Sequence, residues 1–169
     1  FYAQKYPTQE ENESRKHYEF IVSFLREYGY ERYEISNFAR NQKYSRHNLT
    51  YWHNEEYYGC GLGASGYVDG VRYENTKSLP EYLKGNFISS SEKITSKELE
   101  EYFLITNLRL EKGFSKEAYI NCFGVDFLDK YKDTIIKHDL LKYFSIDDER
   151  VSLNDEGLLL MDYIILKLI

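Results

Sequence analysis

The sequence of 169 residues predicts an α+β fold. Segments with apolar residues at helical spacing alternate with short runs of strand-forming residues. Residues that favour helix starts precede several of the helical segments, and one Asp-Gly pair joins two strand-like runs. The second half has its own order of elements: three helices, a β-hairpin and a closing helix. This order is typical of a winged-helix-like domain.

In the first half, a helix leads into a strand and a long loop. Thr8–Glu11 is a capping box, apolar residues follow at helical spacing, and Gly29 is suited to end the helix. The next predicted elements are a strand at Tyr30–Ile35, an irregular loop at Asn37–Trp52 and one helical turn at Glu55–Tyr58.

A hairpin and a short helix complete the first half. Asp69-Gly70 separates Tyr67-Val68 from Val71–Tyr73, which predicts a tight turn between two strands. Ser78 and Pro80 are expected to open a short helix over Leu79–Lys84. Ser89–Ser91 is expected to be a junction.

The second half has a cap before each helix. Thr95, Ser115, Asp126 and Asn154 are each expected to start a helix. The hairpin is predicted at Tyr143–Ile146 and Arg150–Leu153, around the turn Asp147–Glu149.

Charge argues against a nucleic-acid partner. The chain has 22 Lys and Arg against 28 Asp and Glu, a net charge of -6, and residues 91–169 contain 11 basic against 16 acidic residues. Phosphate backbones are bound mainly by Lys and Arg, so the winged-helix-like part is expected to dock or cover rather than to bind DNA.

Cysteine content and hydropathy limit the class further. Cys60 and Cys122 form no C-x-x-C pair, so a disulfide framework or a zinc site is not expected, and a reducing, cytosolic setting is favoured. No apolar run approaches the roughly 20 residues of a membrane span, so no integral membrane segment is expected.

The motif His47-Asn48-x-x-Tyr51-Trp52 contains the only Trp of the chain. A neutral imidazole can bind haem iron, an indole offers a flat apolar wall, and arginines can pair with propionates. The residues alone leave a second interpretation open, in which His47 and Asn48 satisfy backbone groups of a long loop. Gly59-x-Gly61-x-Gly63 is not a dinucleotide fingerprint, because no suitable βαβ unit follows.

Together with longer matches, these residues resemble a known family. The matches are Tyr33-Glu-Ile-Ser-Asn-Phe-Ala39, His47-Asn-Leu-Thr-Tyr-Trp52, Tyr57-Tyr-Gly-x-Gly-x-Gly-Ala64, Arg72-Tyr-x-Asn75, Leu108-Arg-Leu-x-x-Gly113 and Val151-Ser-Leu-x-x-x-Gly157, with Phe1-Tyr2 similar to the end of a T-x-F-Y loop. The chain resembles the oxygen-independent coproporphyrinogen III oxidase-like group of radical S-adenosylmethionine (SAM) proteins, the HemW/HemN family, and within it the HemW branch of haem chaperones.

The resemblance implies the domain plan. Residues 1–88 are expected to be the C-terminal portion of a radical SAM barrel, a partial (β/α) barrel with an added β-hairpin. Residues 89–169 are expected to form the HemN-type winged-helix-like domain. The C-x-x-x-C-x-x-C motif that holds a [4Fe-4S] cluster and SAM is missing here. The chain is therefore expected to be the C-terminal part of such a protein, with no catalytic residue and no radical chemistry of its own.

The resemblance also implies the cofactor contacts. His47 is expected to contact haem, as a candidate iron ligand, with Asn48 beside it, Tyr51 and Trp52 as walls and Arg46 at a propionate. Ala39 and Tyr67 match positions that line the SAM pocket in the oxidase branch. Where the family usually has Ala-His after G-x-G, this chain has Ala64-Ser65.

For the full-length protein, the resemblance implies a cytoplasmic haem chaperone that delivers haem to respiratory proteins. A dimer is one arrangement that it allows. Two alternatives stay open: oxidative decarboxylation of coproporphyrinogen III in porphyrin biosynthesis, and a non-catalytic docking or lid domain.

Overall fold

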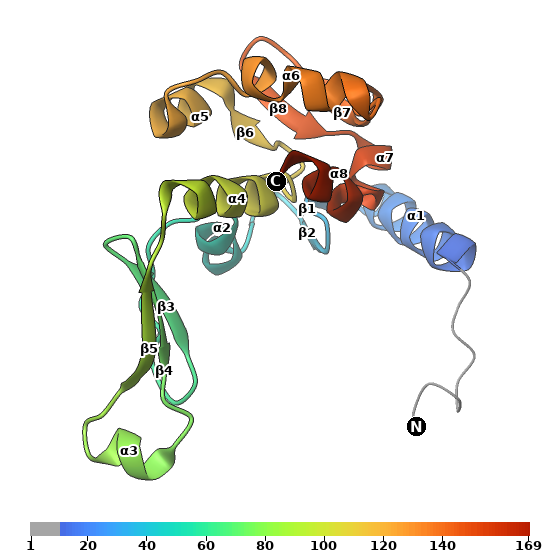
Figure 1. Cartoon of the computed structure of the whole chain (residues 1–169). Helices are drawn as coiled ribbons and strands as arrows, with labels where there is room; N and C mark the ends of the chain where they lie inside the picture. Colours follow the sequence, from blue (N-terminus) through green and yellow to red (C-terminus); the bar gives the residue numbers. More distant parts are fainter. Residues whose placement is uncertain (1–10) are drawn as a thin grey trace.

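The computed structural model describes residues 11–169 and confirms the α+β class (Figure 1). Helices and three small sheets alternate, and the described residues contain no closed barrel. In chain order the elements are α1 (Glu11–Glu27), β1 (Glu31–Glu34), β2 (Asn37–Ala39), α2 (Arg46–Trp52), β3 (Ser65–Val68), β4 (Val71–Asn75), α3 (Leu79–Leu83), β5 (Ile88–Lys93), α4 (Ser96–Asn107), β6 (Phe114–Ser115), α5 (Lys116–Phe123), α6 (Phe127–Lys137), the 3-10 turn η1 (Leu141–Tyr143), β7 (Phe144–Ile146), β8 (Arg150–Leu153), α7 (Asp155–Leu159) and α8 (Met161–Leu168).

The second half has the element order of a winged helix, as predicted. Its helices α4, α5 and α6 precede the hairpin β7–β8, and β6 completes an antiparallel sheet in the order β6-β8-β7. Thr95, Ser115 and Asp126 accept hydrogen bonds from first-turn amides of these three helices, and Thr95 forms a full capping box with Glu98. One cluster of buried apolar side chains, drawn from residues 103–168, packs between the elements.

The three-stranded sheet β3-β4-β5 forms an arm that projects from the rest of the molecule, with α3 at its tip (Figure 1). Asp69 (φ 52°) and Gly70 (φ 72°) both adopt the left-handed conformation in the turn between β3 and β4, as a two-residue hairpin requires. Ser78 caps α3, as expected.

Strand β1 joins the two halves of the chain. One edge pairs with β2, and the other bonds to the segment that follows α4. The Ile35 amide donates to the Arg109 carbonyl (3.1 Å), and the Glu111 amide donates to the Tyr33 carbonyl (3.1 Å). The hairpin is therefore continuous with the second half through main-chain hydrogen bonds.

Two local predictions for the first half were wrong. Asn37–Trp52 is not an irregular loop, because it contains β2 and α2. Glu55–Tyr58 is not a helical turn: the Tyr57 amide and carbonyl instead pair with those of Tyr67 (2.8 and 2.9 Å), which fixes the segment beside the arm.

Two further differences lie at the ends of predicted elements. Ser89–Ser91 is not a junction but the middle of β5, which pairs along β4. The closing helix is divided at Leu160 into α7 and α8. The capping box Thr8–Glu11 and the Phe1-Tyr2 match involve residues that lie outside the described part. The division into residues 1–88 and 89–169 stays a prediction.

Across residues 11–169, no helix combines the length and the apolar character that are needed to cross a bilayer.

Candidate functional site

The His47–Trp52 motif lies on helix α2. The Ser45 hydroxyl caps this helix by accepting from the Asn48 amide (3.3 Å). The segment is rich in His, Asn, Thr, Tyr and Trp, which are weak helix formers, and this composition made a loop the natural prediction. The cap and packing against α4 favour the helix instead.

His47 and Tyr51 lie one turn apart and share a face of α2. Their rings meet edge to face with centroids 4.8 Å apart, and the Tyr51 ring meets Tyr57 in the same manner at 4.5 Å. His47 is exposed, while both tyrosines are half-buried. The structure thus brings together an accessible imidazole and an aromatic wall of two tyrosines.

Trp52 lies on another part of the helix and packs against the second half. The Arg109 guanidinium lies over its ring, 4.5 Å from the centroid, and also pairs with the Glu34 carboxylate at 3.4 Å. Trp52 Nε1 and Arg109 Nε are buried and have no hydrogen-bond partner within the part of the chain that the structure describes. Trp52 therefore anchors α2 to the second half rather than forming one surface with His47.

Glu34 is fully buried beneath this contact. Its carboxylate also accepts from the Ser36 amide (2.8 Å) and the Asn37 side-chain amide (2.5 Å). A carboxylate within a strand-like run can be either functional or an exposed strand residue, and the sequence around Glu34 does not distinguish these. Its burial with satisfied oxygens is typical of a structural carboxylate.

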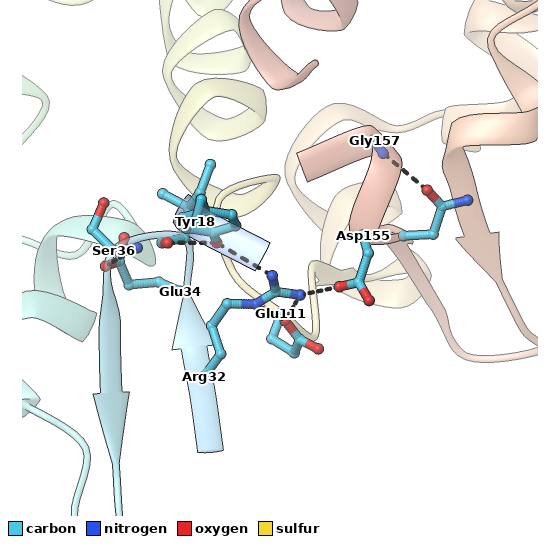
Figure 2. Close-up of polar contacts among 9 residues, drawn as sticks. Tyr18, Arg32, Glu34, Ser36, Glu111, Asp155 and Gly157 are labelled. Carbon is cyan, nitrogen blue, oxygen red and sulfur yellow. Dashed lines mark hydrogen bonds and ion pairs between the residues drawn. The ribbon is translucent and has the colours of Figure 1, made fainter. Parts of the chain in front are cut away.

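Arg32, also on β1, was not predicted from the sequence. Figure 2 shows its guanidinium reaching Glu111, Asp155 and the Tyr18 hydroxyl, at 2.6, 2.5 and 3.2 Å. Burial opposes the charge, but the hydrogen bonds to Glu111 and Asp155 outweigh it and raise the pKa of Arg32. The signal in the sequence was a pair of charged residues, Arg32 and Glu34, within a strand-like run, because charged side chains that become buried need polar partners.

Arg46 and Asn48 stand apart from His47. Arg46 is the first residue of α2, is exposed, and precedes Leu49 by three positions, so these two share a side of the helix. Asn48 is half-buried. The expected grouping of Arg46 with His47 around one ligand therefore requires a ligand that extends around the end of α2.

Ala39 and Tyr67, the expected SAM contacts, lie in different sheets. Ala39 ends β2 and is buried beside Glu31 of β1. Tyr67 is buried in β3 under the Arg72 guanidinium, 4.9 Å from the ring centroid. Arg72 also lies 4.0 Å from the Tyr102 ring centroid and donates to the Asn54 side chain (3.0 Å). Arg72 thus links the arm to α4 and to the residues just after α2.

Comparison with known proteins identifies the fold class first. The structure matches "Coproporphyrinogen III oxidase (HemN) from Escherichia coli is a Radical SAM enzyme" with a TM-score of 0.69, over 95% of this chain and 42% of that chain, at 14% identity. The chain therefore has the fold of part of that protein. No family model matches the sequence.

Sequence relatives identify the family. The chain is 38% identical over 152 residues to "Heme chaperone HemW" of Lactococcus lactis, covering 87% of this chain and 40% of the relative. It is 30% identical over 170 residues to "Radical S-adenosyl methionine domain-containing protein 1, mitochondrial" of Danio rerio, covering 88% of this chain and 37% of the relative. The chain belongs to the HemW/HemN family and corresponds to a C-terminal part of it. It spans about two fifths of the length of these curated relatives.

Proposed function

We propose that this chain is the C-terminal region of a radical SAM haem chaperone, which binds haem and passes it to respiratory proteins in the cytoplasm. The observation that carries the proposal is the arrangement of His47: an exposed imidazole on a capped helix, edge to face with Tyr51. The names of the relatives, heme chaperone HemW in several bacteria, agree with a tetrapyrrole cargo.

His47 would contact the haem iron through a neutral ring nitrogen. Its exposure leaves the ring accessible, and the contact with Tyr51 limits its rotation. The Tyr51 and Tyr57 rings would supply an apolar wall for the porphyrin. Arg46 would pair with a propionate from the end of the helix, and Asn48 would add a polar contact there.

Trp52 has a different role in this proposal. Because it packs on Arg109 and the buried Glu34, it fixes the orientation of α2 and hence of His47. Substitution of Trp52 is expected to weaken haem binding because α2 and His47 would no longer be held in place, and not because a wall of the porphyrin site is lost.

The residues of this chain do not fit a [4Fe-4S] cluster. Such a cluster is held by several thiolates, and the sequence has only Cys60 and Cys122, which are far apart and belong to different halves. The described residues contain no group of three metal-ligating side chains. We therefore assign no chemical step to this chain, and we propose the cluster and SAM only for the whole protein, with Ala39 and Tyr67 nearest to SAM.

Haem titration of the chain tests the proposal. His47→Ala is expected to weaken haem binding at least about tenfold and to shift the Soret band, because an iron ligand is lost. His138→Ala is the matched control, since His138 ends α6 in the second half and is not part of α2. Equal affinity and an equal Soret position for wild type and His47→Ala would remove His47 as the ligand.

The oxidase alternative has weaker support. The similarity to the oxidase is one of fold, at 14% identity, whereas the relatives at 38% identity are named haem chaperones. Product analysis of the full-length protein with coproporphyrinogen III under anaerobic conditions separates the two functions, because only the oxidase releases a decarboxylated product.

A further inference from the structure

A cavity of about 390 Å³ lies between β1, the C-terminal end of α2 and residues 110–113. Its wall includes Tyr33 and Tyr44, whose ring centroids are 4.9 Å apart, and Leu49. Sites for small ligands usually enclose about 300–1,000 Å³ and are lined mostly by apolar and aromatic groups. The cavity has the size and the wall for a small, flat molecule.

The cavity is separate from the His47 cluster. Leu49 and His53 line it, and they are one turn apart on α2. His47 and Tyr51 are each two residues away from Leu49 in sequence, which places them on roughly the opposite side of α2 from Leu49, because a helix turns about 100° per residue. One helix therefore presents two different surfaces.

The charge around the cavity is positive, although the chain is acidic. The lining contains the cations Arg26, Arg32, Lys112 and Arg150, against the carboxylates Glu31 and Glu111. Asp155, outside the lining, also pairs with Arg32 (Figure 2), and the balance still stays positive at four against three. The net charge of the whole chain is -6, so this local excess of cations opposes the general trend.

The carboxylates at the cavity already have partners. Glu111 binds Arg32 at 2.6 Å, and Glu31 accepts from the Tyr44 hydroxyl at 3.1 Å. The Arg150 guanidinium donates to the carbonyls of Lys112 and Gly113, which are neutral acceptors, and the carboxylate that acts on it, Asp147, is shared with Lys116. Lys112 and Arg26 are exposed at the rim.

We propose that this cavity binds a small planar aromatic anion, with its ring against Tyr33, Tyr44 and Leu49 and its acidic group facing Lys112, Arg26 and Arg150. The apolar wall sets the preference for a ring, and the cationic rim sets the sign of the charge. The proposal is independent of haem binding at His47.

Calorimetric titration with 2-naphthalenesulfonate tests the proposal, with 2-naphthalenemethanol as a neutral probe of the same ring. We expect saturable binding of the sulfonate at a 1:1 ratio. Binding of the alcohol should be roughly fivefold to tenfold weaker, since the neutral probe has no charge to pair with the cations at the rim. Raising the salt concentration should narrow that difference through screening. Equal affinity for the two probes, or no saturable binding, would overturn the proposal.

Variants locate the site. Leu49→Trp should fill the cavity and abolish binding, and the double variant R26A K112A should weaken the sulfonate without changing the alcohol. Lys132→Ala, on an exposed position of α6, is the matched control and should leave both unchanged. If Leu49→Trp misfolds by circular dichroism, the R26A K112A result still decides: unchanged sulfonate binding contradicts the proposal. His47→Ala should retain sulfonate binding, which keeps this outcome distinct from haem binding.

Discussion

The two halves of the chain bury different chemistry. The second half has a continuous cluster of buried apolar side chains, all from residues 103–168, in which ring contacts link Phe103 and Phe127 through Phe114 and Tyr119. Among the described residues of the first half, few apolar side chains are buried, and the buried polar side chains are at least as numerous. Those apolar residues are Tyr33, Ala39 and Tyr67, and the polar ones are Arg32, Glu34, Asn75 and Thr76.

This contrast indicates how each half is stabilised. Burial of apolar area is non-directional and is the larger favourable contribution to folding, so the second half has a core of its own. The first half is attached by directional contacts instead: Arg32 to Glu111 and Asp155, Arg109 to Glu34 and Trp52, and the main-chain bonds of β1. The surface that carries His47 therefore depends on charged contacts with the second half for its position.

The strongest test of the apolar half is Phe127→Ala. Phe127 is 1% exposed, and its removal should lower the free energy of unfolding by about 3–5 kcal/mol, as for other large aromatic deletions. Urea unfolding followed by far-ultraviolet circular dichroism measures the change. Ile136→Ala, on the same helix but 69% exposed, is the control and should change it by less than about 0.5 kcal/mol. Similar losses in both variants would contradict a core at this position.

The charged attachment is tested by Arg32→Ala. This change leaves Tyr18, Glu111 and Asp155 without their shared donor, and it should cost about 2 kcal/mol, within the range for hydrogen bonds to charged groups. Trp52, the only Trp, reports on the first half by its fluorescence. In Arg32→Ala, we expect the urea midpoint measured by Trp52 fluorescence to fall below the midpoint measured by circular dichroism.

Lys84→Ala is the control for that experiment, because the Lys84–Glu81 pair is exposed, lies at the end of α3 and makes no link to the second half, so it should move neither transition. If the fluorescence and dichroism transitions of Arg32→Ala stay coincident, the two halves unfold as one unit and the attachment is not the weaker part.

Glu100 is the one carboxylate buried in the second half, and it gives a pH test. Burial alone would raise its pKa, but bonds from Lys130, Tyr119 and Tyr131 outweigh burial and lower it. Because the folded-state pKa lies below the unfolded value, the stabilisation is present above about pH 4.5 and is lost as pH falls through the folded pKa. Glu100→Gln should therefore be about 1.5 kcal/mol less stable at pH 7, with the difference shrinking toward pH 3. A constant difference across that range would contradict the assignment.

The elements that the sequence predicted well are those set by local chemistry. Thr95, Ser115, Asp126 and Asn154 bond to amides two or three residues away, so each cap is visible in a short window of sequence. Asp69-Gly70 sets its turn in the same local manner.

What the sequence did not predict depends on distant partners. Helix α2 packs on α4, about fifty residues later, and its own residues disfavour a helix. The burial of Glu34 depends on Arg109, 75 positions away, so a strand pattern alone could not distinguish a buried carboxylate from an exposed one. For the candidate site, the motif put His47, Tyr51 and Trp52 forward as haem contacts, which stays a prediction; the rings of His47 and Tyr51 meet in the structure, whereas the separate position of Trp52 is a property of the tertiary fold.

The smallest effect is expected for Arg109→Lys, which retains the charge and removes the planar group over Trp52. Lys can still pair with Glu34, so the loss should be about 0.5–1 kcal/mol, the contribution of a cation–π contact. The Trp52 emission maximum should shift to longer wavelength as the ring loses its cover. Arg40→Lys, which removes the similar but longer contact over Tyr30 (5.5 Å), is the control and should leave Trp52 emission unchanged. If Arg109→Lys weakens haem binding while His47 is intact, the charged contacts of the first half set the position of the proposed ligand. If haem binding is unchanged, α2 is positioned by its Ser45 cap and by Tyr51 and Tyr57 instead.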